Sequence, residues 1–253
     1  MSEKKIKFVI PARYNSSRLA GKPLIELAGK SMISRVYEIV HQSVPNAEVV
    51  VATDDKRIVE HLAQHSIPYV LTDASHVSGT DRVAEAARQL NWDDSDIIIN
   101  VQGDEPLIPN SLITEFAKFC SMVSNFSMGT ITVPVETKEQ LCDSNIVKVV
   151  LDENRNALMF SRSVIPFNRD THNHEFDLSN YLRHIGIYAY RNDILQKITN
   201  TPPCRMENIE KLEQLRALWL GIDISVYESN ILPQAGIDTP ADVIRVSEYL
   251  ESL

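Results

Sequence analysis

Short apolar runs alternate with amphipathic segments along the first hundred residues of the chain. The runs are rich in Val and Ile and are bounded by polar residues, which is typical of buried β-strands. Between them, apolar residues such as Ile33, Val36 and Val40 recur at three- and four-residue spacing, which predicts helices with one buried face. In chain order, the pattern predicts strands at 6–10, 48–52, 68–71 and 96–101, separated by helices around 32–40, 58–62 and 82–90.

This alternation predicts an α/β fold with a mostly parallel sheet, because parallel neighbours need a crossover connection, which is usually a helix. Helices should cover both faces of the sheet and so make a three-layer αβα sandwich. Ligands on such sheets bind beyond the carboxyl ends of the strands. We therefore expect functional residues directly after the strands at 6–10, 48–52 and 96–101.

The second half of the chain has a less regular pattern. Apolar spacing predicts one helix over 207–220, with Ile209 and Trp219 on its buried face. Another helix should begin after Thr239, which is a good cap and is followed by proline. The polar stretch 166–183 predicts a loop. We also predict strands at 128–135, 146–151 and 184–190.

Composition narrows the class of protein. The length of 253 residues fits one large domain, within which we expect a smaller lobe at about 125–220. A formal net charge of −9 argues against nucleic acid or an anionic membrane as a general partner. No apolar stretch approaches the roughly 20 residues that span a bilayer, so we expect no membrane insertion. Three scattered cysteines without a CxxC pair fit a reducing cytosol.

The most informative segment follows the first strand and reads PARYNSSRLAGKP (11–23). Arg13, Arg18 and Lys22 bring three cations together on an acidic chain. Arginine forks match phosphate oxygens and lysine adds a point charge, so the segment predicts a polyphosphate clamp. It is not a P-loop, because proline follows Gly21-Lys22 where that motif has Ser or Thr. The alternative is a solvated basic turn.

Two acidic segments are candidate metal sites. Asp104 follows a buried strand in VQGDEP, and Asp238 precedes the last helix in GIDTP. Mg²⁺ binds through a few carboxylates together with substrate phosphates, so we expect both aspartates at one Mg²⁺. The alternatives are an acidic turn for Asp104 and helix capping for Asp238.

Small polar residues recur in ATD (52–54) and SGTDR (78–82). Thr53, Ser78 and Gly79 would lie at a strand end or a helix start, where they can present backbone groups to a base and a ribose. The alternative for this pattern is simple capping, with Thr80 and Asp54 as ordinary helix starters. No Ser/His/Asp or Cys/His pattern is present, so we expect no enzyme nucleophile.

Taken together, these segments resemble the CMP-Kdo synthetase family, the 3-deoxy-manno-octulosonate (Kdo) cytidylyltransferases. The match runs along nearly the whole chain and in the family's order. It rests on IPARYNSSRLAGKPL (10–24), VATDD (51–55), SGTDR (78–82), NVQGDEPLIP (100–109), VKVV (147–150), FSRSVIPFNRD (160–170), YLRHIGIYAYR (181–191), ENIEKLEQLRAL (207–218) and GIDTPADV (236–243). One departure is Ala20, where the family usually has proline.

The resemblance implies a nucleotide-diphospho-sugar transferase-like fold, with residues 1–253 as one nucleotidyltransferase domain and a lobe that forms a homodimer. It implies that CTP and Kdo give CMP-Kdo and diphosphate with Mg²⁺, for lipopolysaccharide synthesis in a Gram-negative cytoplasm. The implied nucleotide ligands are Arg13, Arg18, Lys22, Thr53, Ser78, Gly79 and Gln102. The implied sugar ligands are Gln102, Arg162, His184, Tyr188, Glu213 and Gln214. Arg13, Lys22, Asp104 and Asp238 are the implied catalytic residues, and the two aspartates are the implied metal ligands.

Two alternatives stay open at the level of sequence. One is a cytidylyltransferase for a related acidic sugar, such as 8-amino-Kdo or sialic acid, because the clamp and the metal site would look alike. The other is a non-catalytic sensor of nucleotide sugars on the same fold, which would need neither the metal ligands nor the clamp cations.

Overall fold

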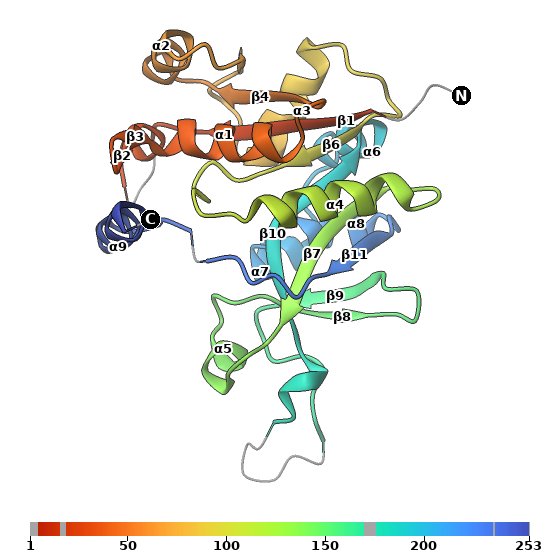
Figure 1. Ribbon diagram of the computed structural model, residues 1–253. Helices are drawn as coiled ribbons and strands as arrows, with labels where there is room; N and C mark the ends of the chain where they lie inside the picture. The colour runs from red at the N-terminus through yellow and green to blue at the C-terminus, as the bar shows by residue number, and fades with distance from the viewer. Residues whose placement is uncertain (1–4, 16–18, 170–175, 235, 253) are drawn as a thin grey trace.

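The computed structural model describes residues 5–15, 19–169, 176–234 and 236–252. Its central sheet has the strand order β11-β7-β10-β6-β1-β4-β5 (Figure 1). Parallel pairing joins β6, β1, β4 and β5, and also β11 and β7, whereas β10 is antiparallel to both its neighbours β6 and β7. These strands are β1 (Ile6–Ala12), β4 (Glu48–Thr53), β5 (Tyr69–Leu71), β6 (Ile97–Asn100), β7 (Met128–Pro134), β10 (Leu182–Arg191) and β11 (Ile224–Glu228).

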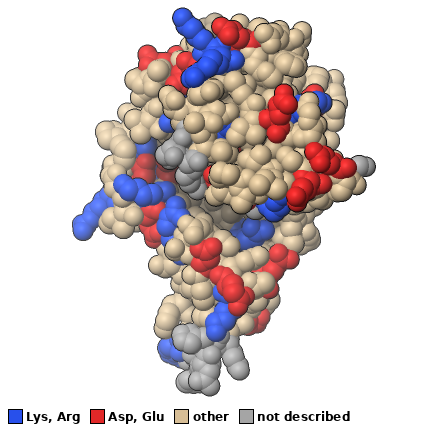
Figure 2. Space-filling model, turned by 90° about the vertical axis from the view of Figure 1, so that its left-hand side faces the viewer, with Lys and Arg blue, Asp and Glu red and all other residues tan. Residues whose placement is uncertain are grey.

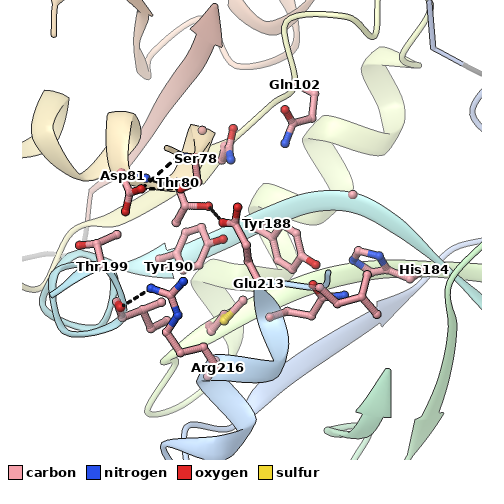
Figure 3. Close-up of a pocket in the computed structure, with 18 of the residues that line it drawn as sticks. Ser78, Thr80, Asp81, Gln102, His184, Tyr188, Tyr190, Thr199, Glu213 and Arg216 are labelled. Carbon is pink, nitrogen blue, oxygen red and sulfur yellow. Dashed lines mark hydrogen bonds between the residues drawn. The ribbon is translucent and has the colours of Figure 1, made fainter. Parts of the chain in front are cut away.

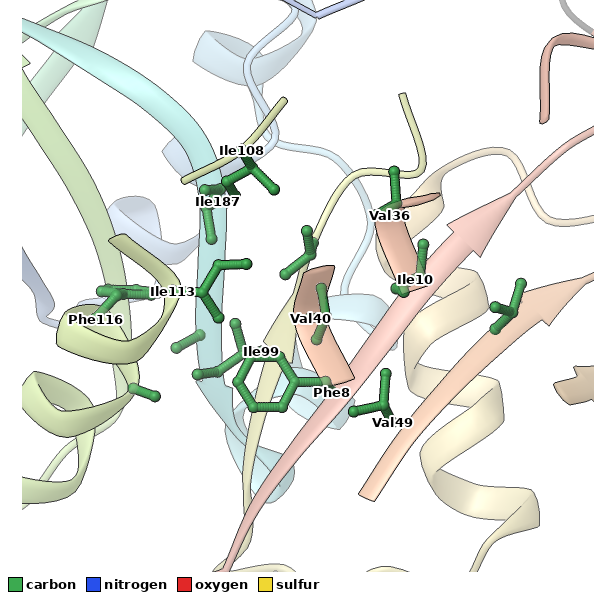
Figure 4. Packing of buried hydrophobic residues seen from close by; sticks show 14 of the residues in the cluster. Phe8, Ile10, Val36, Val40, Val49, Ile99, Ile108, Ile113, Phe116 and Ile187 are labelled. Atoms are coloured by element: carbon green, nitrogen blue, oxygen red, sulfur yellow. The ribbon is translucent and has the colours of Figure 1, made fainter. Parts of the chain in front are cut away.

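Helices cover both faces of the sheet, as the alternating pattern predicts. Successive residues of β1 point to opposite faces: Phe8 and Ile10 enter one apolar core, and Val9 enters the other. Figure 4 shows the first core, where Val36 and Ile113 pack against the sheet. The helices on this face are α1 (Met32–Ser43), α2 (Lys56–Gln64) and α4 (Asn110–Met122). Those on the other face are α3 (Gly79–Gln89), α6 (Asn192–Thr199) and α8 (Gln214–Trp219).

A smaller lobe extends from one end of the sheet (Figure 1). It contains α5 (Lys138–Cys142), β8 (Lys148–Leu151), β9 (Ala157–Ser161) and the 3₁₀ turn η2 (Leu178–Asn180). Lys148 anchors it: the side chain is fully buried, and its Nζ donates to the carbonyls of Asp143, Ile146 and Arg162 at 2.9, 2.6 and 2.7 Å. Burial lowers the pKa of Lys148, and the three carbonyls satisfy its three donors.

The C-terminal helix α9 (Pro240–Glu251) packs against the hairpin of β2 (Glu26–Leu27) and β3 (Lys30–Ser31). Leu27, Ile237 and Val246 share a small apolar cluster there. Thr239 and Asp242 form a reciprocal capping box, so the predicted helix start is confirmed. This packing brings the segment before α9 to the loops that follow β1 and β6.

The single helix predicted over 207–220 is wrong. The chain forms α7 (Arg205–Glu210) and α8, and between them Lys211 adopts a left-handed conformation with φ 54°. A buried ion pair between Glu207 and Arg216 holds the two short helices together. The apolar spacing runs across this break, and Ile209 and Trp219, predicted as buried, are 71% and 60% exposed.

The loop predicted at 166–183 is partly confirmed. Residues 166–169, 176 and 177 form no helix or strand, but η2 and the start of β10 lie within the range. Residues 170–175 lie outside the described part of the chain. The pattern also missed α4, α6, β9 and β11, although each has a buried apolar face.

Candidate functional site

The carboxyl ends of β1 and β6 meet at one edge of the sheet, because these strands are parallel neighbours. The loops that follow them, the start of α3 and the segment before α9 enclose a cavity of about 410 Å³, which we call the clamp cavity. Figure 2 shows this side of the molecule, hollowed between the body and the lobe, with basic and acidic side chains interspersed. The cavity is lined by Pro11, Ala12, Arg13, Asn15, Lys22, Pro23, Gly79, Gln102, Gly103, Asp104 and Asp238.

Lys22 is the central cation of the clamp cavity. It opens the 3₁₀ turn η1 (Lys22–Leu24) after Gly21, whose φ of 70° suits glycine. The Lys22 Nζ donates to Asp104 Oδ2 at 2.6 Å and to Asp238 Oδ1 at 3.1 Å. The lysine side chain is 11% exposed, against 39% and 53% for the aspartates, so the carboxylates face the cavity while the ammonium lies beneath them.

Backbone contacts explain why two aspartates 134 residues apart converge. Gly103 lies so close to β1 that a Cβ there would be 2.9 Å from the Pro11 carbonyl oxygen, which brings the loop after β6 against the first strand. The Ile237 amide then donates to the Asp104 carbonyl at 3.0 Å. The predicted meeting of Asp104 and Asp238 is therefore present in the fold.

This carboxylate pair fits a hard divalent cation. The two oxygens lie within hydrogen-bond distance of one nitrogen, which is close enough to bind one ion, and carboxylate oxygen is the donor that Mg²⁺ prefers. Within the described ranges, no group of three or more His, Cys, Asp or Glu side chains is placed to hold a metal. A metal here would therefore need further oxygens from a ligand. Burial, with Asp104 nearby, raises the pKa of neighbouring Glu105 to about 7, so this third carboxylate is partly protonated at neutral pH.

Arg13 and the start of α3 form the other wall of the clamp cavity. Arg13 Nη2 donates to the His76 carbonyl at 2.8 Å, which holds the guanidinium beside the loop that leads into the helix. Ser78 caps α3 in a reciprocal capping box with Asp81, so capping does occur in this segment, but at Ser78 and not at Thr80. Asp55, and not Asp54, caps α2. Gly79 nevertheless lines the cavity, and a helix start with exposed amides favours anionic groups.

A second cavity of about 460 Å³ adjoins the first, and we call it the β10 cavity (Figure 3). Gly79 and Gln102 line both cavities, so the two are continuous at these residues. Four of the residues expected at a sugar site line the β10 cavity together with Gln102, namely His184, Tyr188, Glu213 and Gln214.

His184 presents a neutral imidazole to the β10 cavity. Its Nε2 lies 2.9 Å from the Thr130 hydroxyl, which donates its single proton to the Ile187 carbonyl at 2.8 Å. Burial lowers the pKa of His184 to about 3, so the ring accepts hydrogen bonds at neutral pH and carries no positive charge.

Two buried polar atoms of the β10 cavity lack a protein partner. Asn100 Oδ1 and Gln214 Nε2 have no hydrogen bond within the described residues. Leaving such groups unpaired costs about 1–3 kcal/mol each, so native structures rarely tolerate them without a ligand or water. Both side chains line the β10 cavity, although these two atoms are themselves shielded from solvent.

Two of the expected site residues that the structure describes are not brought into either cavity. Arg162, expected to bind a sugar, follows β9 and donates instead to the carbonyls of Glu210 and Ser144 at 2.8 and 2.9 Å. Thr53 is fully buried, and its hydroxyl accepts the Asp55 amide at 3.3 Å. Arg18 lies outside the described residues.

Asn100, Thr80 and Tyr190 also line the β10 cavity and were missed from the sequence. Asn100 had a readable signal, since it is the polar last residue of a buried strand. Tyr190 had the period-two spacing from Tyr188, which places both side chains on one face of β10. Thr80 had no such signal, because a threonine in the first turn of a helix is ordinary.

Comparisons with known proteins agree with this geometry. The family model described as cytidylyltransferase matches residues 7–224. A protein of Paraburkholderia phytofirmans named 3-deoxy-manno-octulosonate cytidylyltransferase 2 is 51% identical over 246 residues, which cover 97% of this chain and 94% of that protein. A protein of Burkholderia ambifaria with the same name is 49% identical over 248 residues, covering 97% and 93%.

A solved structure described as CMP:2-keto-3-deoxy-manno-octonic acid synthetase complexed with CTP superposes with a TM-score of 0.90. It is 38% identical and covers 98% of this chain and 99% of its own. The predicted α/β sandwich with a mostly parallel sheet is thereby confirmed. The chain belongs to the cytidylyltransferase family.

Proposed function

We propose that this chain transfers CMP from CTP to the acidic sugar Kdo and releases diphosphate, as a 3-deoxy-manno-octulosonate cytidylyltransferase. The observation that carries the proposal is the junction of the clamp cavity and the β10 cavity at Gly79 and Gln102. One cavity has the chemistry for a triphosphate and the other for a polyhydroxylated acid. The relatives reported above are named for Kdo, and none of them for sialic acid or an amino-substituted Kdo.

The nucleotide belongs in the clamp cavity. Arg13 and Lys22 supply positive charge for the phosphates, and the start of α3 at Gly79 adds backbone donors. Diphosphate carries the charge that develops as it leaves, so cations fixed beside it lower the barrier more than they stabilise bound CTP.

We further propose that Asp104 and Asp238 hold Mg²⁺ when the nucleotide binds. Held there, the ion would supply positive charge that polarises the α-phosphate. Lys22 lies between the same two carboxylates, so its ammonium balances their charge and keeps them together in the free protein. Among the described residues no third His, Cys, Asp or Glu side chain is placed to complete the site, which supports a metal whose other ligands come from CTP and water.

Kdo belongs in the β10 cavity and supplies its own nucleophile, the anomeric hydroxyl. That hydroxyl attacks the α-phosphorus, and diphosphate leaves in line on the opposite side. Catalysis is then alignment of two ligands across the junction, a contribution that reaches several kcal/mol when the reacting atoms are held in contact. His184, Asn100 and Gln214 line this cavity and give it polar side chains for the sugar hydroxyls.

The direct test is diphosphate release by the purified chain with CTP and Mg²⁺, measured with Kdo, with N-acetylneuraminate and without an acceptor. We expect release only with Kdo, and its loss when EDTA removes the metal. Release that does not depend on Kdo would refute the acceptor, and full turnover in EDTA would refute the metal.

We also propose that the enzyme is a homodimer joined through the lobe and serves lipopolysaccharide synthesis in the cytosol. Exposed apolar side chains on β9 and beside the lobe support the dimer, since Leu158, Ile209 and Trp219 are 60%, 71% and 60% exposed. No helix in the described part of the chain is long and apolar enough to cross a membrane. Light scattering on the 28.6 kDa chain tests the dimer, and a monomeric mass would count against it.

A further inference from the structure

Thr80 lies where three elements that are distant in sequence meet. Its Oγ1 donates to Glu213 Oε2 at 2.8 Å, and Tyr190 lines the same cavity beside them. Thr80 lies in the first turn of α3, Glu213 precedes α8, and Tyr190 lies on β10. Figure 3 shows the three side chains together, with the bond from Thr80 to Glu213 dashed.

The Thr80 hydroxyl is not needed to cap its helix. Ser78 and Asp81 already satisfy the start of α3 through their reciprocal capping box. A bond from Thr80 to a residue 133 positions away therefore serves something other than the helix end. Because Gly79 lines both cavities, this bond ties the wall of the clamp cavity to a carboxylate of the β10 cavity.

The hydrogen bond between Thr80 and Glu213 has one possible direction. A threonine hydroxyl has a single proton, and the ionised carboxylate of Glu213 can only accept, so Thr80 donates to Glu213. Tyr190, which also lines the cavity, stays protonated because burial holds its pKa well above its ordinary value.

We propose that Thr80 is a positioning residue that orients the Glu213 carboxylate toward the acceptor sugar. The inference rests on the proposed function, because Glu213 lines the cavity in which that function places the sugar. The hydrogen bond from Thr80 restricts rotation of the carboxylate, so Glu213 meets the sugar hydroxyls in one orientation. Through Thr80, that orientation depends on the position of α3, against which the nucleotide lies.

The surroundings of Glu213 make the bond measurable. Burial raises the pKa of Glu213 and the Thr80 hydrogen bond lowers it; Asp81 and Glu207 raise it further, and Arg216 lowers it. Tyr188 and Tyr190 face it from β10 and stay neutral because burial raises their pKa. Thr80→Val removes one stabilising bond to the ionised form, so the pKa of Glu213 should rise and the carboxylate should protonate at a higher pH.

The experiment compares Thr80→Val, Thr80→Ser and Tyr190→Phe with the matched control Thr114→Val. Like Thr80, Thr114 lies on a helix and donates to a distant segment, here to the Ser43 carbonyl at 3.0 Å. It lies on α4 and lines neither cavity. For Thr80→Val we expect the KM for Kdo to rise about tenfold, as loss of a hydrogen bond to a charged group does, with the KM for CTP nearly unchanged. The acid limb of kcat/KM for Kdo should move to higher pH in Thr80→Val. Thr80→Ser should restore both the KM for Kdo and the position of the acid limb. Tyr190→Phe should shift both less than Thr80→Val does.

A lower melting temperature without any change in the KM for Kdo or in the acid limb would make the bond merely structural and overturn the proposal. A raised KM for Kdo and a shifted acid limb in Thr114→Val would also overturn it. Titration of the Glu213 carboxyl by carbon-13 NMR adds a readout that needs no turnover, and an unshifted pKa in Thr80→Val would refute the orienting bond. Absence of Kdo-dependent diphosphate release in the wild type would instead refute the proposed function, so the two failures are distinguishable.

Discussion

Replacing Asp104 with asparagine should lower kcat by about 100-fold or more, the usual cost of losing a preorganised electrostatic group. The side chain keeps its size, and the Asp104 carbonyl still accepts the Ile237 amide, so the fold around the site should survive. Only the charge that faces the clamp cavity is lost. Steady-state turnover at saturating CTP, Kdo and Mg²⁺ measures the effect.

Asp193→Asn is the matched control for this prediction. Asp193 also pairs with a cation, since Arg191 donates to both its oxygens at 2.6 and 2.8 Å. It lies at the opposite edge of the sheet, where its amide binds the Asp94 carbonyl just before β6. We expect its kcat to match the wild type, and unchanged turnover in Asp104→Asn would remove Asp104 from the mechanism.

Replacing Lys22 with methionine should lower kcat by about 100-fold, because the charge developing on diphosphate loses one of the cations that line the clamp cavity. The variant should also reach half-maximal rate at a lower Mg²⁺ concentration. The Lys22 ammonium contacts Asp104 and Asp238, so without it the metal no longer displaces a competing cation. These opposite changes distinguish a leaving-group cation from a general loss of structure.

Lys7→Met is the control for charge removal. Lys7 pairs with Glu48 at 2.6 Å and lines neither cavity. A pair at the protein surface contributes at most about 1 kcal/mol, so we expect no effect on rate or on metal dependence. A Lys22→Met enzyme with normal kcat would exclude Lys22 from the transition state.

The pattern of the chain predicts the fold best where one rule governs both sequence and structure. The strands after residues 6, 48 and 96 are buried between two helical layers, so their apolar runs are unambiguous. The rule fails at Lys211. The apolar residues keep helical spacing across this position, but its backbone is left-handed and breaks the helix in two. The ion pair of Glu207 and Arg216 joins the two parts. Periodicity does not report such tertiary contacts.

The site divides in the same way. The positions of Asp104 and Lys22 in the site can be predicted from the sequence, because the loops that follow parallel strands lie at one edge of the sheet. The meeting with Asp238 depends on α9 packing against the β2–β3 hairpin, a long-range contact without a local signal. Arg162 shows the reverse case. Its residue type suits a sugar carboxylate, but its guanidinium donates to the backbone carbonyls of Glu210 and Ser144 instead.

The central claim is that the chain joins the α-phosphate of CTP to Kdo across the junction of the two cavities. Following CTP labelled with phosphorus-32 at the α-position through a single turnover tests it most directly. The account predicts that the label moves into a CMP–Kdo conjugate, with one diphosphate released per conjugate formed and no transfer in Asp104→Asn on the same timescale. Label that stays in CTP, or that appears as free CMP before any conjugate forms, would contradict it.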